Sequence, residues 1–330
     1  MDTTPDRNRP NLDLGDGCPS ILVAVNGRAS GWQALEWAVA ECAASRSPLR
    51  IVHAINDTLL MLDPLGDRAL PWLEEAPEHG ARVLDEAARR AGLVASDVVI
   101  STILEVGATA ASVRRAARKD ALIVVGRGPT NRSGLRSTGW RIARRARGPV
   151  VIVELDDERR IGPSAGRVVL GIDDSAGPPA AGVYAFQAAS RRGIGLTVIH
   201  ACPPRTRSRR RNEGGRLLNH LRKLAAIDDA LQDYGDAFPD VDVCRRFVAG
   251  APGPALVSES DGAALLVIGA RSPSRLHNTR LSPVARTALR RARSPVALIR
   301  TPHAASPARV TERSPHRGSD LSTLGTATDA

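Results

Sequence analysis

Short runs of apolar, mostly β-branched residues alternate along this chain with stretches in which apolar residues recur at helical spacing. In the amino-terminal half, the apolar runs predict five strands, at about residues 20–26, 49–55, 97–104, 121–126 and 149–154. The runs 21–25 and 121–125 are apolar almost throughout, which is typical of parallel strands covered on both faces.

The stretches between these runs predict helices. After the first strand, Ser30-Gly31-Trp32-Gln33 is interpreted as a capping box. The positions that then fall at helical spacing are Leu35, Ala38, Val39 and Cys42. A second helix is predicted from about Glu78 to Ala91, with Gly92 as its carboxyl-terminal stop. Its inward positions are Val83, Leu84, Ala87 and Ala88.

Four sequence blocks occur twice, in the same order. Residues 21–26 (ILVAVN) return as 168–173 (VVLGID), and 50–54 (RIVHA) return as 197–201 (TVIHA), both 147 positions later. Further along, 121–126 (ALIVVG) return as 264–269 (ALLVIG), 143 positions later, and 144–150 (RRARGPV) return as 290–296 (RRARSPV), 146 positions later. A repeat of this length predicts two complete copies of one domain.

The predicted organisation is therefore two tandem Rossmann-like α/β domains, each a five-stranded parallel sheet between helices. We expect a disordered tail at 1–18, domain 1 at 19–155, a linker at 156–165, domain 2 at 166–301 and a second tail at 302–330. In domain 2, Leu217, Leu221, Leu224 and Ala225 are predicted to line the second helix, and Gly235 to end it. The apolar final strands, Val150–Val153 and Val296–Ile299, lead us to expect that the two copies pack as an intramolecular pseudo-dimer.

The charge balance is basic. The 330 residues carry a net charge of +11, and 44 of the 46 basic residues are arginine, since the only lysines are Lys119 and Lys223. The arginines are spread over both copies, and the densest run, 205–211, is interpreted as a solvated loop. We therefore expect no nucleic-acid partner, although an arginine-driven nucleic-acid or partner-binding module stays open as an alternative.

From the sequence we expect neither a targeting segment nor a metal or redox site built on cysteines. No run of 18 apolar residues suggests a membrane span, and the polar, acidic start has no apolar signal core, so we expect a cytoplasmic protein. No cysteine pair has C-x-x-C spacing, which favours reduced thiols over a metal or redox site. The cysteines are Cys18, Cys42, Cys202 and Cys244.

In open α/β sheets, ligands bind beyond the carboxyl ends of strands, where the strand order reverses. Here the residues after the first strand are Asn26 and Asp173, and the loops after the fourth strand start at Gly126 and Gly269. His53 and His200 close the second strand of each copy; with no second ligand nearby in sequence, we interpret them as hydrogen-bonded residues at a strand end. Asp173 and Asp174 are adjacent, so at most one of them is expected to reach a ligand such as Mg²⁺.

With these motifs, the sequence resembles the universal stress protein family over residues 19–155 and 166–301. The features that carry the resemblance are the first strand ending in Asp, the V-H-A strand, the V-V-G turn and the R-x-P-V-x-x-V final strand. The resemblance implies a five-stranded parallel sheet whose last strand often pairs with a second domain. One subclass of the family binds ATP through the strand-one Asp and a loop of pattern G-x2-G-x9-G-[S/T].

The first copy keeps Gly126 and Gly139 of that pattern but has Pro129 at the second glycine and Trp140 at the hydroxyl position. Pro129 has no N–H to offer a phosphate, and Asn26 replaces the Asp. These changes predict an inactive site in domain 1.

The second copy keeps Asp173, Ser175 and Gly269, and places Ser272 and Ser282 at the other two glycines. Serine retains an N–H and adds a hydroxyl, so ATP binding is expected here if anywhere. Ser282 followed by Pro283 also has the pattern of a plain helix N-cap.

Arginines crowd both loops and leave two interpretations open: a side-chain phosphate site, or an ordinary surface loop, which we favour. They are Arg127, Arg132, Arg136, Arg271, Arg275 and Arg280. We find no motif for a nucleophile, a Walker loop or a metal protease. The resulting hypothesis is a non-catalytic stress-response module. One alternative is an ATP-binding protein with slow hydrolysis in domain 2, and the other is the arginine-driven module named above. A higher homo-oligomer is compatible with each of them.

Overall fold

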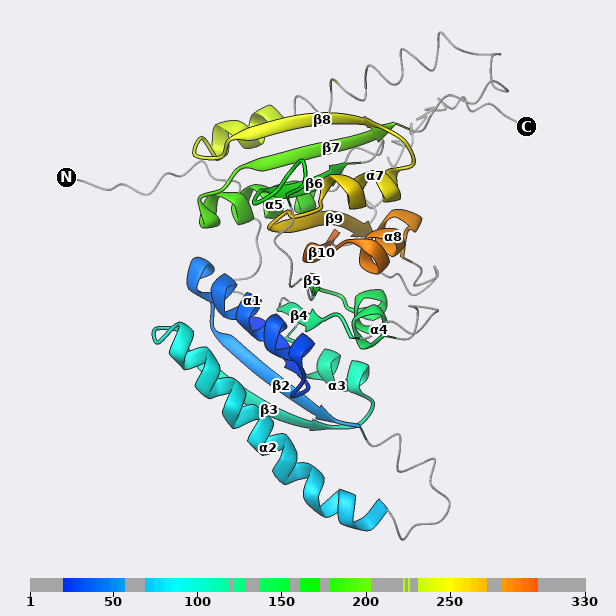
Figure 1. The fold of residues 1–330 in the computed structure, drawn as a ribbon. Helices are drawn as coiled ribbons and strands as arrows, with labels where there is room; N and C mark the ends of the chain where they lie inside the picture. Colours follow the sequence, from blue (N-terminus) through cyan, green and yellow to red (C-terminus); the bar gives the residue numbers. More distant parts are fainter. Residues whose placement is uncertain are drawn as a thin grey trace, which may run out of the picture.

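One continuous sheet runs through both halves of the chain (Figure 1). The computed structural model describes residues 20–56, 69–118, 121–128, 137–154, 161–172, 179–202, 222, 225, 231–271 and 281–301. Within these residues the 10-stranded sheet has the order β3-β2-β1-β4-β5-β10-β9-β6-β7-β8.

The first copy supplies five parallel strands. They are β1 (Ile21–Val25), β2 (Leu49–Ile55), β3 (Ile100–Val106), β4 (Leu122–Gly126) and β5 (Val150–Val153). Four of them lie close to the predicted ranges. The third begins at Ile100 instead of residue 97, because residues 96–98 form the turn that leads into it.

The second copy repeats this arrangement. Its strands are β6 (Val168–Ile172), β7 (Leu196–Cys202), β8 (Val243–Ala249), β9 (Leu265–Arg271) and β10 (Val296–Thr301). In both copies the first strand lies between the second and the fourth, so the strand order reverses at the same place. The prediction of two α/β domains with parallel sheets is therefore confirmed.

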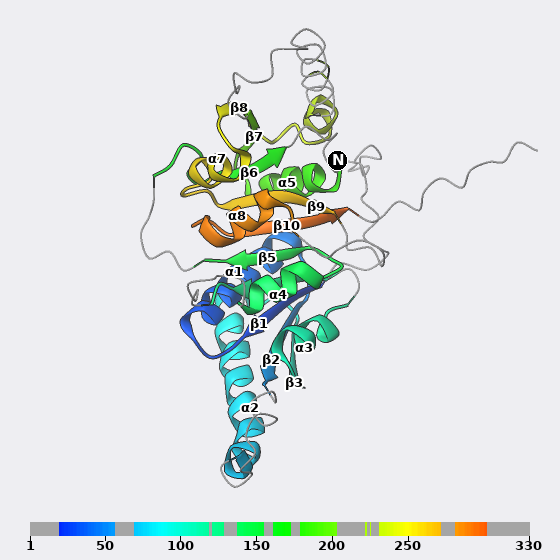
Figure 2. The same cartoon turned by 90° about the vertical axis from the view of Figure 1, so that its right-hand side faces the viewer.

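The helices cover the two faces of the sheet (Figure 2). On one face lie α1 (Ala29–Ser45), α2 (Ala69–Val94) and α5 (Pro179–Arg192), and the other carries α3 (Thr109–Ala116), α4 (Thr138–Arg145), α7 (Pro252–Glu259) and α8 (Pro283–Arg291). Alternate strand residues feed two separate apolar cores: Val23 and Val124 face the first set of helices, and Ile123 and Leu266 face the second. None of the described helices is long and apolar enough to cross a membrane.

Two predicted helix starts are wrong. The proposed capping box at Ser30 does not form, because α1 already begins at Ala29 with Arg28 as an N-cap that makes no side-chain cap bond. The turn before it is held by Asn26, whose Oδ1 accepts a hydrogen bond from the Arg28 N–H at 3.1 Å. The second helix starts at Ala69, not at Glu78, and continues through Pro77. Its predicted inward face is correct, with Val83, Leu84 and Ala87 buried.

Both glycines predicted to stop a helix lie inside one. Gly92 is within α2, which continues to Val94, and an added Cβ there would meet nothing within 4 Å. Gly235 lies in the helical segment 231–237, so that helix ends two residues later than expected. Ala225, predicted to line the same helix, is exposed, and Leu217, Leu221 and Leu224 lie outside the described residues.

The two copies meet at the pair β5–β10, which is antiparallel, with Val296 opposite Ile152 and Leu298 opposite Val150. These are the apolar final strands from which the pseudo-dimer was expected. Side chains join the copies on both faces of this seam. On one face Glu41 of α1 pairs with Arg191 and Arg192 of α5. On the other, the buried Arg300 of β10 donates a hydrogen bond to the Ala143 carbonyl of α4.

Candidate functional site

The candidate site of the first copy lies at the carboxyl ends of β1 and β4, which are neighbours in the sheet. The structure brings Asn26 and Gly126 together there: Gly126 packs against the Ser30 carbonyl in the first turn of α1, directly after the Asn26 turn. A Cβ on Gly126 would collide with that backbone. The close packing of strand and helix thus explains Gly126 without a ligand.

Gly139, the second retained glycine, also has a packing role. It is buried in the first turn of α4, and an added Cβ would lie 3.2 Å from the Ile152 Cδ1 and 3.3 Å from the Val125 Cγ2. The next residue, Trp140, is 8% exposed and belongs to the core beneath α4. The position where the family pattern has a small hydroxyl therefore holds a core side chain.

Two backbone N–H donors that a phosphate could use are already occupied in this copy. The Arg28 N–H donates to the Asn26 side-chain oxygen at 3.1 Å. At the start of α4, Ser137 is the N-cap, and its hydroxyl accepts a hydrogen bond from the Trp140 N–H at 3.2 Å. A helix N-terminus attracts anions through such free amides. The side-chain cap removes one of them.

A buried ion pair lies at the same edge of the sheet. Arg127 follows β4, its side chain is only 9% exposed, and its Nε pairs with the carboxylate of Glu154, which follows β5. The Arg127 N–H also donates to the Val153 carbonyl at 2.6 Å. Burial lowers the pKa of Arg127, and the charge of Glu154 opposes that shift. Arg127 is therefore neither a free phosphate ligand nor the exposed loop arginine that we favoured from the sequence.

In the second copy, Gly269 and Ser282 lie in the described part of the site. Gly269 is half-buried in β9 and pairs with Ile299 of β10. Ser282 is the N-cap of α8, with its hydroxyl accepting from the Ala285 N–H at 3.1 Å and Pro283 at the first turn, which confirms the N-cap interpretation. Asp173, Ser175 and Ser272 lie outside the described residues, as do Arg132, Arg136, Arg275 and Arg280.

Sequence reasoning missed that Ser137 is the counterpart of Ser282. The family spacing sets Ser282 against Gly139, whereas the structure makes Ser137 and Ser282 the two N-caps, 145 positions apart. Gly126 and Gly269 are only 143 apart, so the loop of the second copy is longer by two residues. The sequence already indicated this longer loop, because the repeat offset changes from 143 at the fourth strand to 146 at residues 144–150.

His53 lies in β2 and His200 in β7, each two residues before the end of its strand. The Nδ1 of His53 lies 3.0 Å from the Val25 carbonyl oxygen, to which it must donate, which confirms its expected role. Burial lowers the pKa of His53, and the nearby His79 lowers it further, whereas the hydrogen bond to Val25 opposes the shift. His200 is buried and packs edge-on against Phe247, with ring centroids 6.2 Å apart. The described residues contain no group of three or more His, Cys, Asp or Glu side chains that could hold a metal ion.

Comparison with known proteins gives a consistent result. A model of the universal stress protein family matches residues 19–154 and 165–300. Universal stress protein Rv2623 of Mycobacterium tuberculosis is 27% identical over 301 residues, covering 88% of this chain and 99% of that protein. A universal stress protein of Mycolicibacterium smegmatis is 27% identical over 293 residues, covering 85% of this chain and 96% of its own length. Among solved structures, a universal stress protein from Archaeoglobus fulgidus superposes with a TM-score of 0.63 at 18% identity, covering 86% of this chain and 98% of that chain.

Proposed function

We propose that this chain, which belongs to the universal stress protein family, is a non-catalytic regulatory protein of the cytoplasmic stress response. In this proposal the second copy retains weak ATP binding and the first copy has lost it. The chain then carries one nucleotide-responsive domain fused to a domain that serves as its permanent partner in the sheet.

The observation that carries the proposal is the Arg127–Glu154 pair of the first copy. The Glu154 carboxylate lies beside the start of the β4–α4 loop, where a bound nucleotide would bring its phosphates. Arg127 is already neutralised by this carboxylate, so the pair offers no net positive charge to a phosphate. Pro129, which lacks an N–H, and the buried Trp140 act in the same direction.

The second copy lacks this ion pair. At the positions that match Arg127 and Glu154 it has Ala270 and Arg300, and Arg300 reaches the Ala143 carbonyl of the first copy. No acidic side chain thus replaces Glu154. Asp173 and Ser175 keep the residue types of the family's ATP-binding subclass, which supports assigning the remaining affinity to this copy.

Calorimetric titration with ATP and Mg²⁺ tests the proposal in the full chain. We expect binding in the millimolar range or tighter, its loss in Asp173→Ala, and its retention in Asn26→Ala, the matched change in the first copy. Absence of heat at millimolar ATP would refute nucleotide binding by the second copy. ATP turnover that disappears in Asp173→Ala would instead favour the rival function, an ATP-binding protein with slow hydrolysis.

A further inference from the structure

The two faces of the sheet differ in charge. On the face of α3, α4, α7 and α8, the helices α3, α4 and α8 contain arginines and no acidic residue, and α7 contributes only Glu259. On the opposite face, α1 carries Glu36 and Glu41 and no basic residue, and α2 has more acidic than basic residues. The third helix of that face, α5, ends in Arg191 and Arg192, and both pair with Glu41. Most of the positive charge of the helices is therefore collected on one face, which we call the basic face.

Two equivalent arginine triplets dominate the basic face. Arg144 and Arg145 end α4 and Arg147 follows it, and Arg290, Arg291 and Arg293 repeat this pattern at the end of α8, 146 positions later. Helices α4 and α8 lie on either side of the β5–β10 seam (Figure 2). All but Arg144 are exposed, and none of the six forms an ion pair with a described residue.

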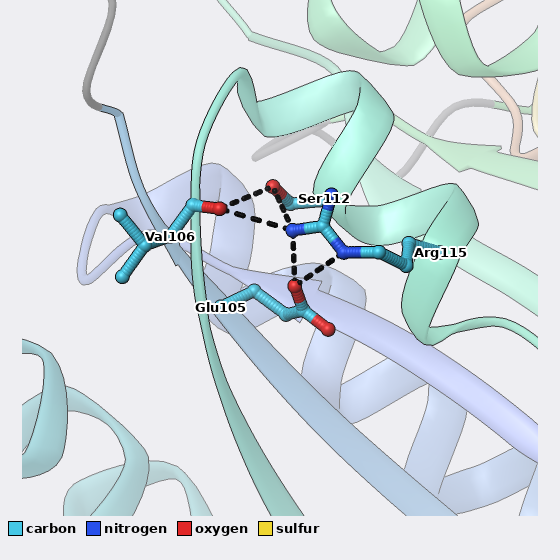
Figure 3. A network of polar contacts seen from close by, with 4 residues as sticks. All are labelled: Glu105, Val106, Ser112 and Arg115. Atoms are coloured by element: carbon cyan, nitrogen blue, oxygen red, sulfur yellow. Dashed lines mark hydrogen bonds and ion pairs between the residues drawn. The ribbon is translucent and has the colours of Figure 1, made fainter.

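The arginines are close enough to repel one another. Arg114 of α3 is partly buried, and its pKa is lowered by burial and then by the charges of Arg145 and Arg141 on α4. By contrast, Arg115 is neutralised locally (Figure 3). Its guanidinium pairs with Glu105, donates to the Val106 carbonyl at 3.0 Å and to the Ser112 hydroxyl at 3.2 Å. A surface lined by charges of one sign attracts partners of the opposite charge.

We propose that the basic face binds the phosphate backbone of double-stranded DNA without reading its sequence. Arginine forks match phosphate oxygens in bidentate geometry, and helices that present several of them give a salt-dependent, sequence-independent contact. The pseudo-two-fold relation between the triplets matches the local two-fold symmetry of a duplex.

Among the described residues, this face lacks the side chains by which single-stranded nucleic acids and membranes are bound. Single strands are held by exposed aromatic rings on which bases stack, but Trp140, the aromatic residue of α4, is buried in the core. Peripheral membrane binding uses apolar side chains that enter the lipid. The exposed large apolar residues of the described chain are Leu93, Val94, Val99, Leu104, Val106, Ile161 and Phe247, and none belongs to α3, α4, α7 or α8.

Fluorescence anisotropy tests the inference. The probe is a labelled DNA duplex of about 30 base pairs with an arbitrary sequence. The test variant carries Arg145→Gln, Arg147→Gln, Arg291→Gln and Arg293→Gln. The control carries Arg46→Gln, Arg82→Gln, Arg89→Gln and Arg90→Gln, which removes the same formal charge from α2 and the end of α1 on the opposite face.

We expect the unmodified chain and the control to bind at low salt, and the test variant to lose at least about ten-fold in affinity. The slope of log affinity against log salt should shrink by about three to four, close to one for each phosphate contact removed. No binding at low salt, or equal loss in the control, would overturn the inference. So would binding to anionic lipid vesicles in place of DNA. If the arginines only offset the helix dipoles, the test variant would melt earlier but bind DNA as before.

Discussion

Glu41 on α1 accepts a hydrogen bond from Arg191 on α5, with 3.0 Å between Oε1 and Nη2, and so ties the first copy to the second. The Glu41 side chain is 2% exposed, and Arg192 pairs with its second oxygen while lying over the ring of Trp37. The positions of the repeat that match Glu41 and Arg191 are Ala188 and Ala44. This contact therefore exists once, and two like copies could not form it.

Replacing Glu41 by alanine should destabilise the protein. Removing one partner of a buried ion pair leaves the other charges without compensation, and we expect the free energy of unfolding to fall by about 3 kcal/mol, the low end for such a change, because both arginines retain some contact with water. Urea unfolding measures this. Glu36→Ala, an exposed carboxylate on the same helix, is the control. Equal urea midpoints for the two variants would show that Glu41 does not hold the seam.

The packing role of Gly126 predicts a second effect. In Gly126→Ala the new methyl group must displace the Ser30 backbone, and overpacking of this kind costs about 1–3 kcal/mol. We expect the melting temperature to fall by about 5 °C. Gly128→Ala, two residues later, adds a methyl where nothing lies within 4 Å and should change little. A melting temperature unaffected by Gly126→Ala would mean that this glycine is not kept for packing.

The pH dependence of His53 follows from its burial. Because the pKa of His53 is lowered in the folded state, the unfolded chain binds the proton more readily. The stability that this group contributes is therefore present above its ordinary pKa of about 6.5 and lost as the pH falls through the folded pKa. NMR titration of the imidazole Cε1–H should give a midpoint below 6.5, and His79→Gln should raise it. A midpoint at or above 6.5 would contradict the account.

Cys42 and Cys244 should differ in reactivity. Burial, with a smaller effect of the Glu41 charge, raises the pKa of Cys42 to about 12, and Cys244 is exposed on the edge strand β8. The thiolate is the reactive form, so iodoacetamide at pH 8 should modify Cys244 and leave Cys42 intact in the folded protein. Peptide mapping after urea unfolding supplies the positive control for Cys42. Comparable labelling of both thiols in the native state would argue against the described burial of α1.

The sequence predicted the sheet well because buried parallel strands are continuous apolar runs, and because the repeat displayed them twice. Helix ends were less predictable. Gly92 and Gly235 have the residue type of a helix stop, but the helical backbone continues past both, and an added Cβ at either would meet nothing within 4 Å. The retained glycines of the first copy matched a ligand pattern, yet their neighbours across the fold, Ser30 and Ile152, explain them equally well.

The ion pairs of the structure could not be predicted from the sequence. Arg127 and Glu154 are adjacent only because β4 pairs with β5, and Glu41 meets Arg191 only because the two copies join through their final strands. Such contacts depend on strand order and on the seam, which local patterns do not encode. Ser137, by contrast, could have been predicted as the counterpart of Ser282, because the change in repeat offset already shows that the loop of the second copy is longer.

Photoaffinity labelling of the full chain with 8-azido-ATP and Mg²⁺, followed by peptide mapping, tests most directly whether nucleotide belongs to the second copy alone. We expect labelled peptides within residues 166–301, protection by unlabelled ATP, and no label in Asp173→Ala. Label in residues 19–155, protected by ATP and unaffected by Asp173→Ala, would place the nucleotide beside Gly126 and Trp140 and contradict the account.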